Sequence, residues 1–184
     1  MFICTVGSGD VHVDYIKREF GYAVLVPIGY SEDGQYNYFV QTAFSELPGG
    51  ELEYYFNVIE VDGVNNNEYF YTSGWDTRIL IQGDDRLKVL SAICAATRHL
   101  IMAVKPQQCM RCTNDAHQPD KALEKHYLIS KIFEEAGYEV VTADPFHGRR
   151  IWWMIRGTTE SADSLCSEAD PATEATDVEQ RQAD

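Results

Sequence analysis

The pattern of apolar and polar residues changes near residue 84 of the chain. Before this point, short runs rich in aromatic and β-branched residues alternate with turn-forming residues, as is typical of β-strands. Such runs cover residues 2–6, 22–30, 36–44, 53–61, 68–75 and 77–83. The short connections between these runs predict a meander of about six antiparallel strands.

Local signals refine the arrangement of these strands. The segment Ser31–Gln35 (SEDGQ) and the segment LPGGE after it both have the composition of hairpin turns. Pro27 predicts an edge strand or a bulge, because proline cannot donate a ladder hydrogen bond. The run 53–61 is partly apolar on both faces, and it is therefore expected in the centre of the sheet.

After residue 84 the apolar residues recur at helical spacing. Asp84-Asp85 offers an N-cap, and the periodic segment that follows ends at Lys105-Pro106. A second helix is expected from Pro119-Asp120 to Gly137, with a short strand at 107–113 between the two helices. Strands at 138–143 and 150–156 close the chain. The fold class predicted is α+β, with two helices packed on one face of a mostly antiparallel sheet.

Length and charge divide the chain into two parts. The 184 residues carry a formal net charge of -14, and eight acidic residues and one arginine lie in residues 158–184. That segment holds few large apolar residues, so we expect a single compact domain at 1–157 followed by a disordered acidic tail. The negative charge argues against direct binding to nucleic acid or to anionic membranes.

Composition also predicts where the protein resides. The N-terminus lacks the basic residues of a secretory signal, and five cysteines are an odd number for a disulfide framework. The most apolar segment, between Leu87 and Val104, is interrupted by Arg98 and His99. We therefore expect a soluble cytoplasmic protein with reduced thiols.

The segment CMRCTNDAH allows two interpretations. Cys109, Cys112 and His117 have the spacing of the first three ligands of a zinc knuckle, but Ala122 occupies the position of the fourth. Alternatively, the segment is a strand, in which the two cysteines point to opposite faces and cannot share a metal ion. The strand is favoured, with neither a metal nor another cofactor expected.

The turn from Asp144 to Arg150 is the leading catalytic candidate. It combines His147 with Arg149 and Arg150, a set suited to general acid–base chemistry or to the recognition of an anion. The alternative is that these residues only solvate a hairpin turn.

Surface residues are the candidates for binding a partner. Trp152 and Trp153 are adjacent in a predicted strand, so one side chain should enter the core while the other is available as an interface anchor. The alternative is that both are covered within the monomer. Further candidate contacts are the acidic turn residues Glu32, Asp33, Asp84 and Asp85.

Two resemblances bear on function. The segment KALEKHYLISKIFEEAGYEVV followed by RRIWWMIR resembles the end of an acetyltransferase of the GNAT type, although the R/QxxGxG/A loop that binds pyrophosphate is absent. The order of hairpins rich in Tyr and Phe, a helix, a strand after a proline and a second helix resembles small acidic proteins encoded by phages and mobile elements.

The second resemblance implies a protein that binds a host nucleic-acid-handling machine or interferes with it. The function predicted is a non-enzymatic interaction protein that docks on a protein partner, as a phage-type inhibitor of host defence occupying a basic nucleic-acid-binding groove would do. The alternative is a small-molecule transferase of the acetyltransferase type, acting on an acyl-CoA or another anionic substrate.

Overall fold

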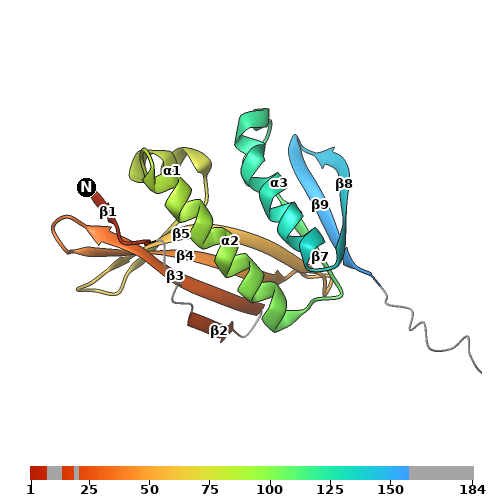
Figure 1. The fold of residues 1–184 in the computed structure, drawn as a ribbon, viewed down its shortest axis with the longest axis horizontal. Coiled ribbons are helices and arrows are strands. Elements are labelled where there is room, and N and C mark those ends of the chain that lie inside the picture. The colour runs from red at the N-terminus through yellow and green to blue at the C-terminus, as the bar shows by residue number, and fades with distance from the viewer. Residues whose placement is uncertain (8–13, 19–20, 158–184) are drawn as a thin grey trace, which may run out of the picture.

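The computed structural model describes residues 1–7, 14–18 and 21–157, with side-chain detail in 1–7 and 21–157. The predicted acidic tail at 158–184 lies outside the described residues. Within the described part, a nine-stranded mixed sheet carries three helices, which confirms the α+β class (Figure 1).

Three long antiparallel strands form the first part of the sheet. They are β3 (Gly21–Ser31), β4 (Tyr36–Glu46) and β5 (Leu52–Asp62), joined by the two predicted hairpin turns. The strands β1 (Phe2–Cys4) and β2 (Asp14–Arg18) pair with β3, and β6 (Glu68–Tyr71) pairs with β5. The register of β3 shifts between Pro27 and Gly29, so the predicted bulge is present.

The second part of the sheet is joined to the first through a short parallel contact. β7 (Gln108–Cys112) runs parallel to β5, and then β9 (Arg149–Arg156) and β8 (Tyr138–Phe146) follow as antiparallel neighbours. β5 thus lies between β4 and β7, as its apolar faces predicted. Only two residue pairs join β5 to β7, after which the strands diverge (Figure 1).

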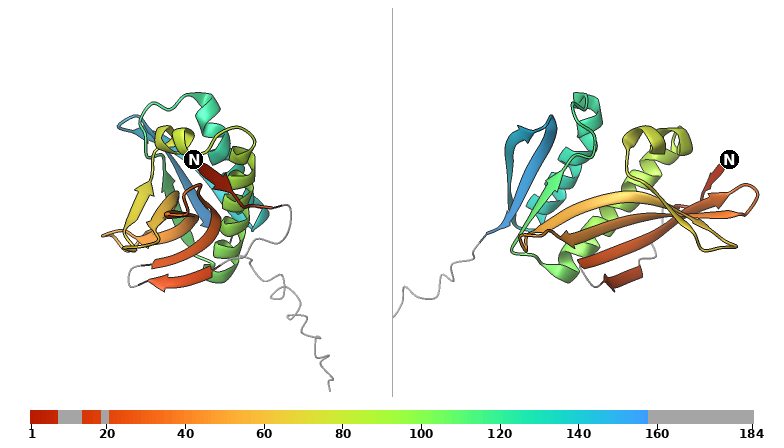
Figure 2. Two further views of the ribbon diagram at one scale, coloured as in Figure 1. Left: turned by 90° about the vertical axis from the view of Figure 1, so that its left-hand side faces the viewer. Right: turned by 180° about the vertical axis from the view of Figure 1, so that it is seen from behind.

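The two predicted helices pack against different parts of the sheet. α2 (Asp85–Val104) lies across β3 and β4, whereas α3 (Asp120–Glu135) packs beside β8 and β9 (Figure 2). α2 is long and apolar enough to span a membrane by length and composition alone. Eight of its residues are buried, as expected of the core helix of a globular domain.

The strand predicted at residues 77–83 is wrong, because the chain forms helix α1 (Gly74–Leu80) there. The Ser73 side chain accepts a hydrogen bond from the Trp75 amide, which caps the first turn. A short continuous apolar run such as Ile79–Ile81 does not distinguish a helix from a strand. α1 has no fully buried residue; it lies along β6 and contacts the core through the partly buried Leu80.

Aromatic rings connect the two parts of the core. Phe133 of α3 meets Phe44 and Tyr54 of the first part edge-on, with ring centroids 6.4 and 5.4 Å away. On its other side it meets Tyr138 of β8 at 5.5 Å. Such edge-to-face contacts add to the stabilisation from area burial, so α3 holds the two halves of the sheet in one core.

Candidate functional site

The acidic residues singled out from the sequence are brought to one end of the molecule. Glu32 and Asp33 lie in the β3–β4 turn, and Asp84 and Asp85 lie at the start of α2. The N-terminal ammonium lies 3.8 Å from the Glu32 carboxylate, which places β1 beside this turn. Figure 1 shows the N-terminus, the β3–β4 turn, α1 and the start of α2 at the same end.

Exposed aromatic and aliphatic side chains share this end. In α1, Trp75 is 69% exposed and Ile79 is 76% exposed, and their spacing of four residues places them on one helix face. On β6, Tyr69 and Phe70 are also exposed. We call this surface the docking end, and it comprises Glu32, Asp33, Tyr69, Phe70, Trp75, Ile79, Asp84 and Asp85.

Trp75 and Ile79 were missed as candidate contacts because their segment was read as strand. The available signal was Ser73 followed by Asp76, since a capping residue and an acidic first turn favour the start of a helix. The Arg78 guanidinium lies 5.1 Å from the Trp75 ring centroid. This contact holds one cation beside the exposed Trp75 ring.

Asp33 stays ionised in its turn. Its carboxylate accepts hydrogen bonds from the Ser31 hydroxyl and from the Gln35 amide, and these bonds lower the pKa of Asp33 below its ordinary value. The negative charge at the tip of the hairpin is therefore retained under mildly acidic conditions.

Trp152 does not serve as a surface anchor. It is 2% exposed, because its position in β9 points toward α3. Its neighbour Trp153 is half-buried on the opposite face of the strand. Trp153 thus remains a candidate contact, whereas Trp152 belongs to the core.

Trp152 belongs to a cluster of aromatic and basic side chains that lies where β5 and β7 separate. The His126 ring stacks on Trp152 with centroids 5.4 Å apart and an interplanar angle of 8°. Arg111 donates from Nε to His126 Nδ1 over 3.0 Å, and its guanidinium carbon lies 4.3 Å from the Phe56 ring centroid. Lys125 Nζ lies 5.7 Å from the same Phe56 centroid. We call Phe56, Arg111, Lys125, His126 and Trp152 the Arg111 cluster.

Burial dominates the electrostatics of the Arg111 cluster. Burial lowers the pKa of Arg111 to about 10, and the group remains charged at neutral pH. Burial, together with the charges of Arg111 and Lys125, lowers the pKa of His126 to about 2, so this imidazole is neutral. Burial also lowers the pKa of Lys125 and raises that of Glu53. His126 Nε2 is buried without a hydrogen-bond partner.

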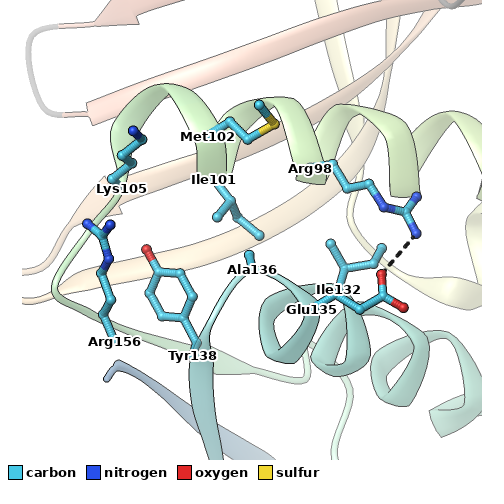
Figure 3. A pocket seen from close by; sticks show the side chains of 9 residues that line it. All are labelled: Arg98, Ile101, Met102, Lys105, Ile132, Glu135, Ala136, Tyr138 and Arg156. Carbon is cyan, nitrogen blue, oxygen red and sulfur yellow. Dashed lines mark hydrogen bonds and ion pairs between the residues drawn. The ribbon is translucent and has the colours of Figure 1, made fainter. Parts of the chain in front are cut away.

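A groove opens between the C-terminal ends of α2 and α3 (Figure 3). Its volume is about 400 Å³. The groove is lined by Arg98, Ile101, Met102, Lys105, Ile132, Glu135, Ala136, Tyr138 and Arg156. Three of these side chains are cationic and one is anionic, which is the reverse of the balance in the whole chain.

The interpretation of the cysteine segment as a strand is confirmed. Cys109 and Cys112 both lie in β7, on opposite faces, and burial raises the pKa of both thiols, to about 12 for Cys109. His117 lies in the following loop with its amide bonded to the Gly148 carbonyl. In the described ranges, no group of three or more His, Cys, Asp or Glu residues is arranged to hold a metal ion.

The histidine turn joins β8 and β9, next to β7. His147 is exposed in the β8–β9 turn, where its ring meets the Phe146 ring at 4.2 Å. Arg149 and Arg150 are also exposed, and the charge of Arg149 acts on Cys112 of β7. The turn therefore presents His147, Arg149 and Arg150 to solvent.

Comparison with protein-family models, curated proteins and solved structures gave no match for this chain. The function is therefore inferred from the geometry of the chain itself.

Proposed function

We propose that this is an interaction protein whose docking end binds a basic surface on a protein partner. The observation that carries this proposal is helix α1, which has no buried residue and exposes Trp75 and Ile79 on one face. Tryptophan is enriched among the residues that dominate binding energy at interfaces. An exposed apolar face of this kind marks an interaction site.

Charge complementarity selects the partner. Glu32, Asp33, Asp84 and Asp85 lie in elements at the same end of the molecule as the exposed aromatic residues, so their carboxylates favour the approach of cations and oppose that of polyanions. Grooves that bind nucleic acid are lined by Lys and Arg. The partner proposed is thus a cytoplasmic nucleic-acid-handling protein, as in phage-type inhibition of host defence, and the chain competes with nucleic acid for its groove.

Affinity capture tests this proposal with paired variants. The full chain is immobilised, and proteins from a host lysate are captured at low and at high ionic strength. A basic partner should bind to the wild type and dissociate as salt rises. Binding should be lost in the Trp75→Ala/Ile79→Ser variant and retained in the matched control Phe146→Ala, which alters an exposed aromatic residue outside the docking end.

Competition then tests the mode of action. Single-stranded or double-stranded nucleic acid should displace the chain from the purified partner, because both occupy the same basic groove. A partner that binds nucleic acid and this chain together, or that is captured equally by the Trp75→Ala/Ile79→Ser variant, would show that the docking end is not the interface.

The transferase alternative is favoured by a separate observation. β5 and β7 are parallel neighbours that diverge after two residue pairs, and ligands of α/β sheets bind beyond the carboxyl ends of such strands. Arg111 and Lys125 supply positive charge there. Thermal stabilisation of the protein by acyl-CoA that is smaller in Lys125→Met than in the wild type would support this candidate. If the stabilisation is smaller in His147→Ala instead, the binding site lies at the β8–β9 turn.

A further inference from the structure

The groove between α2 and α3 has two chemically different ends (Figure 3). At one end the Arg98 guanidinium lies 3.4 Å from the Glu135 carboxylate, so the two charges offset each other. At the other end the groove is lined by Lys105 and Arg156, and the one carboxylate among the lining residues is that of Glu135. Neither of these two side chains has an ion-pair partner among the described residues. The groove therefore carries unbalanced positive charge at one end.

Helix carbonyls near this end do not cancel that charge. The C-terminus of a helix carries partial negative charge on its last carbonyl groups. At the end of α2, the Lys105 amide donates to the Ile101 carbonyl, and the Tyr138 hydroxyl donates to the Pro106 carbonyl over 2.8 Å. At the end of α3, the Ala136 amide donates to the Ile132 carbonyl. The two full charges of Lys105 and Arg156 thus dominate the local potential.

The floor between the two ends is apolar. Ile101 and Ile132 are almost fully buried beneath it, and Met102 is 71% exposed at its edge. Ala136 contributes only a methyl group, which leaves the centre of the groove open. The apolar surface that a ligand can cover here belongs to Met102 and Ala136, which are exposed, and removing this surface from water favours binding.

We propose that the groove binds a small amphipathic monoanion. The anionic group lies between the Lys105 ammonium and the Arg156 guanidinium, and the apolar body covers Ala136 and Met102, above the buried Ile101 and Ile132. This binding site is separate from the docking end and does not depend on the function proposed for it.

The observations favour a small molecule over a membrane surface. A volume of about 400 Å³ lies within the range of small-molecule pockets, roughly 300 to 1,000 Å³. The net charge of -14 opposes approach to an anionic bilayer, in which a lipid would supply the same headgroup chemistry. The occupant proposed is thus a free amphiphile.

Calorimetric titration of the full chain with octanoate tests the proposal. One octanoate per chain should bind saturably. Octanol and octylammonium, which share the apolar chain but lack the negative charge, should bind about tenfold more weakly or not at all. Acetate, which lacks the apolar body, should give no saturable heat.

Variants then locate the site. Lys105→Met/Arg156→Met keeps both stems and removes both charges, and it should weaken octanoate binding by about tenfold or more. Lys105 has a φ of 50°, and methionine in its place meets the same backbone strain, so the fold is retained. Lys131→Met, at an exposed lysine of α3 outside the groove, is the matched control and should bind octanoate like the wild type. Ala136→Leu should block binding by filling the floor, with the thermal midpoint showing that each variant is folded.

Three results would overturn the inference. The first is the absence of saturable octanoate binding, and the second is equal affinity for octanoate and octanol. The third is that a synthetic peptide of residues 158–184, rich in carboxylates, binds through Lys105 and Arg156 while octanoate does not. In that case the groove accepts an acidic chain rather than a small amphiphile.

Discussion

Two tryptophans in the described part of this protein have opposite environments, although each lies close to a positively charged arginine. Trp75 in α1 is 69% exposed, with Arg78 of the same helix 5.1 Å from its ring. Trp152 in β9 is 2% exposed, stacked on His126, which in turn accepts a hydrogen bond from Arg111. The same side chain therefore stabilises the fold at one site and is free for contacts at the other.

The difference comes from what packs over each element. β9 is covered by α3, so every group that faces inward loses water and must find a partner. α1 lies along β6 and rests on the core through Leu80, but it has no fully buried residue, and its Trp75 and Ile79 side chains stay in solvent. Surface that folding leaves uncovered is available for binding.

The largest expected effect is that of Trp152→Ala. Removing this buried ring leaves a cavity beside His126, and the free energy of unfolding should fall by about 3 to 5 kcal/mol. Urea unfolding followed by circular dichroism measures this change. A loss under about 1 kcal/mol would mean that the core at β9 relaxes around the missing ring. Trp152 would then contribute no more to the free energy of unfolding than the exposed Trp75 does.

Arg111→Ala comes next. It leaves His126 Nδ1 without its donor and uncovers the Phe56 ring, so we expect a loss of about 2 to 4 kcal/mol in the free energy of unfolding. Arg149→Ala removes an exposed arginine and serves as the matched control, with a change within about 0.5 kcal/mol. Equal effects of the two substitutions would show that burial does not distinguish them.

The pH dependence of stability tests the neutral state of His126. Its pKa is about 2 in the fold against 6.5 ordinarily, so below pH 6.5 the unfolded chain binds a proton that the folded chain does not. The free energy of unfolding should therefore fall with pH below 6.5 by up to about 1.4 kcal/mol per unit from this group. Above pH 6.5 this contribution is constant.

His126→Gln isolates that contribution. A glutamine oxygen can accept the Arg111 hydrogen bond but does not titrate, so the slope of unfolding free energy between pH 6.5 and about 5 should be shallower than in the wild type. Identical slopes would indicate that His126 is protonated in the folded state.

The smallest expected effect on stability is that of Trp75→Ala. Its ring is exposed, so the free energy of unfolding should change by at most about 0.5 kcal/mol, as measured by the same urea titration. A loss as large as that of Trp152→Ala would place Trp75 in a core contact and remove it as an interface anchor.

The sequence by itself determined the long regular elements. The apolar residues recur at helical spacing over the 20 residues of α2 and the 16 residues of α3, and this pattern predicts a helix and no other element. The turns of the first two hairpins contain glycine and polar residues, which predict turns. Alternation in β7 likewise placed Cys109 and Cys112 on opposite faces, which the structure confirms. These features depend on neighbours in the chain.

Only the tertiary structure decided which side chains meet across the fold. Arg111 and His126 are 15 residues apart, and nothing in their local pattern predicts that α3 places the imidazole over a β7 arginine. The exposure of Trp75 and the burial of Trp152 likewise depend on which elements pack above them. Long-range packing sets solvent access, and solvent access decides whether a polar or aromatic group stabilises the core or remains available for binding.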